Sequence, residues 1–340
     1  MPPPADDVPP EEAFELLGHE TRLAILEALW EANRLSKPHE PIDSTEWYPE
    51  SDAVPFSELR RRVGMRDGSQ FNYHLRKLVG RFVLETDDGY VLDRNGRRIV
   101  SIIRAEEFTE EVVFEEEPID VPCPLCDGQV VLESGSDRTL DVQLWRCTDC
   151  DGLRHVPGMP AGVLGLMDAL SPAGYRDRTP DEVIKALVTW TIHRQTMAVQ
   201  GVCPDCTGPV STSLVRCDDH DDDGRVCVTC GTVFGVRFHS TCDRCYLPWV
   251  IPSEQHVLTH PTVRVFYRDH GYEPKGVDFP LIRAETIADQ TVLSEDPIQV
   301  RTTIEIDGDR LDVIIDGEGV LGGGCVRVAS TGESTARSGE

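Results

Sequence analysis

The sequence predicts an α+β fold. Helices come first along the chain, and short strands with pairs of cysteines between them follow. Three observations predict this fold: two helical stripes followed by a hairpin signal within residues 56–92, a series of C-x2-C pairs after residue 120, and alternation of apolar residues about a turn at Asp307-Gly308 over 298–315. The 340 residues leave room for two or three domains, and a hydrophobic content of 39% is sufficient for packed cores.

The stretch 56–92 combines four elements in a fixed order. Phe56, Leu59 and Val63 have the spacing of one helix face, and Phe71 begins a second stripe that runs through Leu75 to Val79. Glycines 64 and 68 separate the stripes, and Ser69 is the expected N-cap of the second helix. Apolar segments at 82–86 and 90–92 flank Asp88-Gly89, which predicts a hairpin. This order is that of a winged helix-turn-helix.

The flanking residues extend this helical region. Short helices are expected over 13–17, ended by Gly18, and over 21–30, and another over about 94–104. Four prolines and many polar residues predict a long loop at 31–55. The proline-rich start (1–10) and the polar end (329–340) are expected to be disordered.

A basic island coincides with the two predicted helices. The chain carries a formal net charge of −27, yet residues 56–81 contain seven basic side chains against Glu58 and Asp67. Such an island is the electrostatic footprint expected of phosphate binding. The alternative is a helical hairpin with a solvated basic face. The basic residues are Arg60, Arg61, Arg62, Arg66, Arg76, Lys77 and Arg81.

The segments FELLGHETRLAILEALW, FSELRRRVGM, SQFNYHLRKLV and DDGYVL together resemble the arsenical-repressor (ArsR) type of winged-helix transcription regulator, over about residues 11–104. The resemblance implies a homodimer on double-stranded DNA, with helix 69–79 in the major groove. Amide side chains can then recognise adenine and arginine can recognise guanine, with the other basic residues on phosphate, whereas His74 is expected to pack or hydrogen-bond. The implied DNA-facing residues are Arg60, Arg61, Arg62, Ser69, Gln70, Asn72, Tyr73, Arg76, Lys77 and Arg81.

The sequence departs from this family in two respects. The helix before the recognition helix, FSELRRRV, has no cysteine or histidine, and the helix after the hairpin has no histidine, so the ordinary metal-sensor sites of the family do not carry over. The hairpin tip is acidic at Asp87 and Asp88, which repels phosphate. The wing is therefore expected to contact DNA weakly or along its edge.

The cysteine pairs after residue 120 predict two zinc ribbons with the spacing C-x2-C-x20-C-x2-C. VCPDCTGPV at Val202 repeats PCPLCDGQV at Pro122, which indicates an internal repeat. Four thiolates form a closed tetrahedral Zn²⁺ site, so the zinc is expected to be structural rather than catalytic, and disulfides are not expected in a cytoplasmic protein. The first ribbon uses Cys123, Cys126, Cys147 and Cys150, and the second uses Cys203, Cys206, Cys227 and Cys230.

A further pair, Cys242 and Cys245, has no repeat partner. We expect a third zinc site that contains this pair, and its other ligands stay open. Cys217 and His220 offer one ligand pair through C-x2-H spacing, and His256 and His260 offer another. The alternative is an unliganded pair. Cys325 stands alone in a glycine-rich segment and is expected to be a plain small residue.

Three elements complete the predicted organisation. Thr179 signals the start of a helix whose apolar face includes Trp190 and Met197; a helix from His260 ends at Gly271; and Asp307-Gly308 turns a hairpin within 298–315. The predicted domains are a winged helix-turn-helix (11–104), a first ribbon (105–178), a connecting helix (179–200), a second ribbon with the extra pair (201–280), a β-rich segment (281–328) and a tail (329–340).

The charge balance and the absence of enzyme motifs limit the classes of function that the sequence fits. Acidic excess, with lysine only at Lys37, Lys77, Lys185 and Lys275, resembles proteins of salt-loaded cytoplasms, as in halophilic archaea. No apolar run is long enough for a membrane helix, and no secretory signal is present, so a cytoplasmic location is expected. No GxSxG, P-loop or dinucleotide-binding motif is found, so no enzyme is expected. The sequence favours a transcription regulator whose ribbons sense an effector or contact transcription machinery; the alternatives are a protein-binding adapter and an RNA-binding factor.

Overall fold

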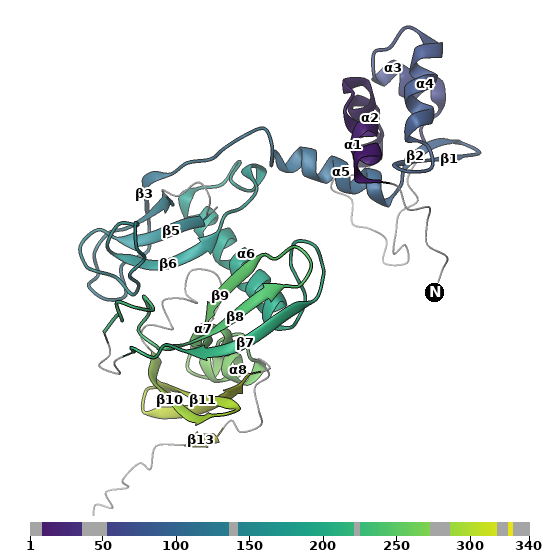
Figure 1. Cartoon of the computed structure of the whole chain (residues 1–340). Helices are drawn as coiled ribbons and strands as arrows, with labels where there is room; N and C mark the ends of the chain where they lie inside the picture. The colour runs from purple at the N-terminus through teal and green to yellow at the C-terminus, as the bar shows by residue number, and fades with distance from the viewer. Residues whose placement is uncertain are drawn as a thin grey trace, which may run out of the picture. The chain divides into compact units, whose positions relative to one another are not determined.

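The computed structural model of the chain describes residues 9–35, 53–135, 142–220, 225–272, 286–317 and 326–328. The chain divides into two compact units, Met1–Glu111 and Val112–Glu340 (Figure 1). The structure is mixed α and β with several small sheets, as the sequence predicts. None of its described helices combines the length and the apolar run needed to cross a membrane.

The described residues of the first unit form five helices and one hairpin. Its helices α2, α3 and α4 and its hairpin enclose a core that includes Leu26, Leu59 and Phe71. Val54 exchanges backbone hydrogen bonds of 2.9 and 3.0 Å with Tyr90, which adds an isolated bridge to the hairpin. The elements are α1 (Pro10–Leu17), α2 (Glu20–Leu35), α3 (Phe56–Arg62), α4 (Gly68–Leu78), β1 (Val83–Thr86), β2 (Gly89–Leu92) and α5 (Arg94–Ala105).

Three local details of this unit differ from the sequence prediction. The N-cap of α4 is Asp67 rather than Ser69, because the Asp67 carboxylate accepts hydrogen bonds from the Ser69 and Gln70 amides at 2.8 and 3.0 Å. Thr86 pairs with Gly89, so the hairpin loop is Asp87–Asp88. Helix α2 continues to Leu35 into the predicted loop, and the rest of that loop, 36–52, lies outside the described residues.

The second unit begins with a four-stranded antiparallel sheet in the order β3-β4-β5-β6. The acidic segment after residue 104 supplies its edge strand β3. The Arg146 guanidinium on β5 pairs with Glu116 and Glu133 across the strands, the latter at 2.5 Å, and the Arg146 side chain is only 11% exposed. These strands are β3 (Glu115–Ile119), β4 (Val130–Ser134), β5 (Val142–Cys147) and β6 (Val163–Asp168), followed by the 3-10 helix η1 (Pro172–Gly174).

Helix α6 (Pro180–Val199) begins at the predicted position, with Thr179 and Glu182 forming a reciprocal capping box. Its first half packs Leu187 into the core of the β3–β6 sheet, and its last turn packs Val199 into the next core. Figure 1 shows α6 beside the strands of both sheets. The predicted apolar face is wrong at Trp190 and Met197, which are 43% and 37% exposed.

Arg194 on α6 forms ion pairs with residues of both halves of the unit. Its guanidinium contacts Asp168 on β6 at 3.1 Å and Asp205 at 2.8 Å, and its side chain is only 13% exposed. The central carbon of the Arg194 guanidinium lies 5.0 Å from the centroid of the exposed Trp190 ring, a cation–π contact. The helix is therefore a shared support for both halves of the unit.

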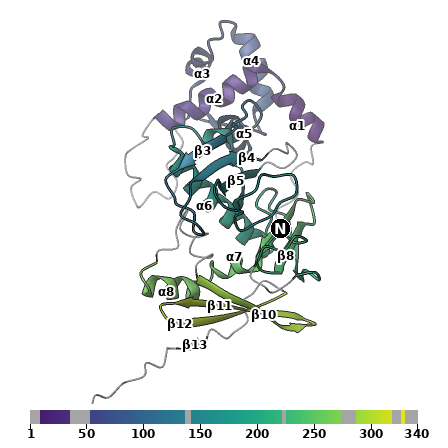
Figure 2. The same cartoon turned by 90° about the vertical axis from the view of Figure 1, so that its left-hand side faces the viewer.

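A three-stranded sheet and a C-terminal sheet share one core. Val263, Phe266 and Tyr267 of α8 are buried against this core, and Figure 2 shows α8 alongside the C-terminal sheet. The predicted turn at Asp307-Gly308 is confirmed, with φ values of 53° and 86°. The elements are β7 (Val210–Arg216), β8 (Val236–Cys242), β9 (Pro248–Pro252), α7 (Ser253–Val257), α8 (Pro261–Asp269), β10 (Ile287–Glu295), β11 (Ile298–Ile306), β12 (Asp309–Asp316) and β13 (Val326–Val328).

Candidate functional site

Among the described residues of the second unit, three groups of cysteines bring their sulfur atoms together. In each group the Sγ atoms all lie within 4.8 Å of one another. Such groups are able to hold a metal ion, because thiolate sulfur is a strong ligand for soft and borderline metals. The groups are Cys123, Cys126, Cys147 and Cys150; Cys203, Cys206, Cys242 and Cys245; and Cys217, Cys227 and Cys230.

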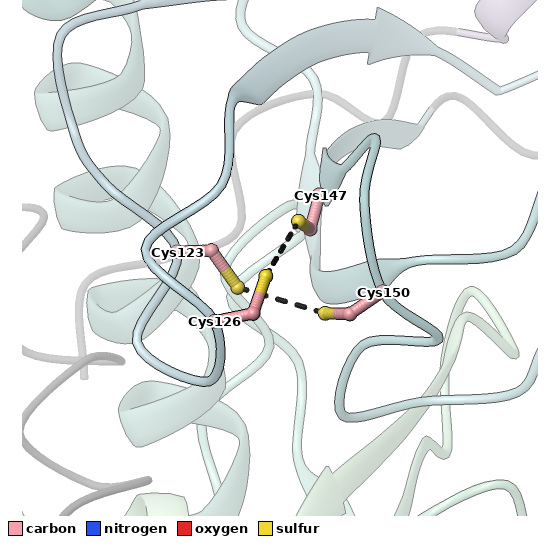
Figure 3. Close-up of side chains that lie close together, drawn as sticks. All are labelled: Cys123, Cys126, Cys147 and Cys150. Atoms are coloured by element: carbon pink, nitrogen blue, oxygen red, sulfur yellow. Dashed lines mark hydrogen bonds between the residues drawn. The ribbon is translucent and has the colours of Figure 1, made fainter.

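The first group is the one that the sequence predicts. Cys123 and Cys126 precede β4, Cys147 ends β5, and Cys150 follows it, so the pairing of Val130 with Cys147 places both C-x2-C turns at one end of the hairpin. Figure 3 shows the four side chains converging. The Sγ atoms of Cys123 and Cys150 are 3.7 Å apart, and those of Cys126 and Cys147 are 3.6 Å apart.

These separations fit one tetrahedral metal ion. Four sulfur atoms bound at about 2.3 Å to a tetrahedral centre lie about 3.8 Å from one another. A disulfide would need about 2.05 Å between two sulfur atoms. Backbone amides also point at the sulfurs: the Leu125 amide donates to Cys123 Sγ at 3.4 Å, and the Asp149 amide donates to Cys147 Sγ at 3.3 Å.

The second group corrects the predicted pairing. The sequence pairs Cys203 and Cys206 with Cys227 and Cys230, but the structure places Cys242 and Cys245 beside the first two cysteines instead. The Sγ atoms of Cys203 and Cys245 are 3.7 Å apart, and those of Cys206 and Cys242 are 3.5 Å apart. The internal repeat is nevertheless present in the strand register. The strand after each first C-x2-C pair begins opposite a cysteine of its second pair: Val130 pairs with Cys147, and Val210 pairs with Cys242.

The cause of the wrong pairing is an insertion. Residues 217–235 lie between β7 and β8, so the second half of the ribbon comes later in the chain than in the first copy. By coincidence this insertion contains its own C-x2-C pair at the expected x20 spacing. The predicted third site is therefore wrong in composition: Cys242 and Cys245 group with Cys203 and Cys206, whereas Cys227 and Cys230 group with Cys217.

The proposed histidine ligands of the Cys242 pair have other roles. His256 is buried with its ring centroid 5.2 Å from that of Phe238. His260 caps α8, where its Nδ1 accepts a hydrogen bond from the Thr262 amide at 3.3 Å. Cys325 lies outside the described residues.

Backbone amides and burial set the pKa values of the cysteines in opposite directions. Amide donation, chiefly from Cys245, lowers the pKa of Cys242 to about 6, and amide donation from Cys230 lowers the pKa of Cys227 to about 7. Burial raises the pKa of Cys150 to about 12. The groups that contain Cys242 and Cys227 thus hold part of their charge as thiolate near neutral pH, and a bound metal ion displaces the remaining protons.

Helix α4 in the first unit presents the predicted DNA-facing residues on one side. Phe71, His74, Leu75 and Leu78 are buried, whereas Tyr73 is 60% exposed and carries the Lys77 ammonium 5.9 Å from its ring centroid. Ser69, Gln70, Arg76 and Lys77 are also exposed, and Asn72 is half-buried.

The remaining predicted basic residues differ in their surroundings. Arg61 and Arg62 pair with Glu58 of the same helix at 2.7 and 2.9 Å, and the Arg61 side chain stays 73% exposed. The Arg60 guanidinium donates to the Arg66 carbonyl at 3.4 Å. Arg81 forms an ion pair with Glu12 of α1 at 3.1 Å, so its guanidinium is engaged by a carboxylate of its own unit.

The fold and the three cysteine groups define an α+β protein with candidate metal centres in its larger unit. Residues 120–321, more than half of the chain, match the model of a family described as Domain of unknown function (DUF7351), and the chain belongs to this family. Residues 10–103 match a second model, described as Domain of unknown function (DUF7347). No curated protein and no solved structure matches the chain.

Proposed function

We propose that this chain is a sequence-specific DNA-binding transcription regulator. Its first unit serves as a winged helix-turn-helix, with α4 as the recognition helix and β1–β2 as the wing. The observation that carries this proposal is the division of α4 into a buried apolar face and an exposed face with Gln70, Tyr73 and Arg76. Amide and guanidinium groups on a helix match the hydrogen-bonding edges of adenine and guanine.

The charge distribution supports the same function. An exposed basic helix end on a chain with a net charge of −27 would direct this part of the molecule to phosphate. The adapter alternative expects Arg60–Arg62 to be buried in salt bridges with the acidic linker. The ion pairs of Arg61 and Arg62 are instead with Glu58 on their own helix, and both arginines are exposed.

The proposal includes a homodimer. Helices α1 and α5 both contact α2, and each exposes an apolar side chain: Phe14 is 72% exposed and Ile102 is 42% exposed. Burial of these side chains against a second copy would stabilise a dimer through the hydrophobic effect. A dimer would also place two α4 helices on a palindromic site.

Structural zinc ribbons complete the proposal for the second unit. The sulfur geometry of the two four-cysteine groups suits tetrahedral Zn²⁺, and four protein ligands would close the site to catalysis. Exposed apolar side chains lie in or directly after the C-x2-C turns of this unit. Leu125 and Val228 lie within such turns and are 48% and 84% exposed, and Tyr246 directly follows one and is 76% exposed. Exposed apolar side chains of this kind favour a role of the ribbons in binding other proteins. The adapter alternative includes the same role.

The DNA-binding proposal is tested by selection from a random duplex library with the full-length protein, followed by fluorescence anisotropy on the enriched sequence. A palindromic motif is expected. The double variant Gln70→Ala, Arg76→Ala should bind that motif more weakly by about 5- to 150-fold per lost base contact, since each contact contributes about 1–3 kcal/mol. Arg264→Ala, which removes one positive charge from an exposed position on α8, is the control. Absence of any enriched motif, or equal affinity of the double variant, would contradict the proposal.

A further inference from the structure

The insertion between β7 and β8 is a separate small module. Its ends are joined by a hydrogen bond from the Cys217 amide to the Gly235 carbonyl at 2.8 Å. Strand pairing runs from Val210 opposite Cys242 at one end of the hairpin to Arg216 opposite Val236 at the other. The insertion thus lies at the end of the hairpin away from the Cys203 group, and its cysteines cannot serve that group.

The C-x2-C turn of the insertion has the backbone of the metal-site turns elsewhere in the unit. The Cys227 amide donates to the Thr232 carbonyl at 3.1 Å, and the Gly231 amide donates to the Cys227 carbonyl at 2.8 Å. The turn that starts at Cys203 has the same two bonds, from Cys203 to Gly208 and from Thr207 to Cys203. In both turns the fourth residue after the first cysteine is left-handed, with φ of 69° and 59°.

A buried histidine of the insertion lies beside one of its three thiols, that of Cys230. His220 is only 9% exposed, and its Nδ1 atom is 3.4 Å from Cys230 Sγ. Its Nε2 atom is 3.1 Å from the Val233 carbonyl oxygen. A Cβ atom at Gly235 would lie 2.6 Å from His220 Cγ, so the absence of a side chain at this glycine makes room for the ring.

The hydrogen bond at Nε2 fixes the state of the ring. A carbonyl oxygen only accepts hydrogen bonds, so Nε2 must carry the proton. In the neutral ring the lone pair is then on Nδ1, which faces the sulfur of Cys230. Donation from the outer ring nitrogen to a backbone carbonyl is the usual way in which a protein orients a metal-binding histidine.

We propose that Cys217, His220, Cys227 and Cys230 form a third zinc site with three cysteine ligands and one histidine ligand, in which Nδ1 of His220 is the fourth donor. Three thiolates alone leave one tetrahedral position open, and the imidazole fills it with a neutral donor. This inference rests on the proposal that the cysteine groups of this chain hold zinc.

The site also links the two halves of the second unit. The Gly231 carbonyl accepts a hydrogen bond from the His155 amide at 3.3 Å, and the Cys230 carbonyl accepts one from the Arg237 guanidinium at 3.2 Å. His155 belongs to the segment between β5 and β6, whereas Arg237 lies on β8. A metal ion that fixes the 227–231 turn therefore fixes its contact with the first ribbon.

The test is a zinc count by native mass spectrometry on the full-length protein, after exposure to a moderate chelator. The wild type should retain three ions per chain. His220→Ala should retain two, and His220→Cys, which restores a fourth ligand, should retain three. His239→Ala is the matched control, because it removes an exposed histidine from neighbouring β8 and should leave three.

The two four-cysteine groups act as an internal standard in this experiment. A wild type with two ions, and no further loss on Cys217→Ser, would overturn the third site while leaving zinc in the ribbons. A wild type with no zinc would instead overturn the broader zinc proposal. If His220→Ala kept three ions under the same chelator, His220 would not be the fourth ligand. In long-range ¹H–¹⁵N spectra, the His220 ring should show a proton on Nε2 and none on Nδ1, and the reverse tautomer would exclude Nδ1 coordination.

Discussion

His74 is a titratable side chain placed in the core of the first unit. It is 4% exposed, and its ring lies 4.1 Å from that of His19. Within the described part of the chain, its Nδ1 atom is buried and has no hydrogen-bond partner. The pKa of His74 is lowered below its ordinary value of 6.5, first by burial and then by the nearby His19 and Arg22.

This lowered pKa makes the stability of the first unit depend on pH. The unfolded chain gains a proton at His74 as the pH falls through about 6.5, whereas the folded chain resists it. Stability is therefore full above about pH 6.5 and falls below it, by at most about 1.4 kcal/mol per pH unit from this group. Denaturant unfolding of the wild type and of His74→Leu at pH 7.5 and 5.5 checks this. The variant should lose less stability on acidification, and equal losses would contradict the assignment.

Residue-level expectations succeed where the signal is local. The buried stripe from Phe71 through Leu75 to Leu78 follows from helical periodicity alone, and the structure confirms it. His74 packs as expected. The N-cap lies at Asp67 and not at Ser69, because the helix begins earlier: the Asp67 carboxylate accepts hydrogen bonds from the Ser69 and Gln70 amides. The outward side of α4 follows from the sequence, but its DNA contacts stay a prediction.

The inserted turn at Cys227–Thr232 depends on one glycine. Gly231 has a φ of 69°, and a Cβ atom there would lie 2.2 Å from the His155 carbonyl oxygen. The position therefore needs glycine for two reasons: its backbone is left-handed, and the backbone of another chain segment approaches it closely.

We expect Gly231→Ala to destabilise the second unit more than Gly158→Ala does. Gly158 also has a positive φ, of 83°, but a Cβ atom there would meet nothing within 4 Å. The backbone cost of about 1–2 kcal/mol is common to both variants, so the difference isolates the clash, worth about 1–3 kcal/mol. Chemical denaturation of zinc-loaded protein measures both. Equal losses of unfolding free energy would mean that the contact with His155 contributes nothing.

At the scale of elements, the sequence predicted which segments form helices and hairpins better than which segments meet. The helix from Thr179 and the hairpin at Asp307-Gly308 carry their own capping and turn signals, and both are confirmed. The second cysteine group was mispaired because C-x2-C spacing reports distance along the chain only. Strand register decides which pair reaches Cys203, and an insertion inside the hairpin leaves no separate mark in the sequence.

The whole molecule carries far more acidic than basic charge, and this imbalance acts on folding and on the proposed DNA binding in opposite directions. With a net charge of −27, mutual repulsion destabilises the compact state, and salt screens it as the Debye length falls from about 10 Å at 0.1 M to about 3 Å at 1 M. Phosphate contacts weaken over the same range, by about 0.9 log units per contact for each log unit of salt.

We therefore expect the thermal unfolding midpoint to rise between 0.1 and 1 M KCl while affinity for the selected duplex falls. Circular dichroism and fluorescence anisotropy on the same samples measure the two quantities. The double variant Glu115→Gln, Glu117→Gln removes two exposed charges from β3. Its unfolding midpoint should rise less with salt than that of the wild type, and the dependence of its DNA affinity on salt concentration should be unchanged. A midpoint that stays constant or falls with salt would show that repulsion does not limit stability. A slope of zero for DNA would remove phosphate contact from the proposed mode of binding, because every such contact must release counterions.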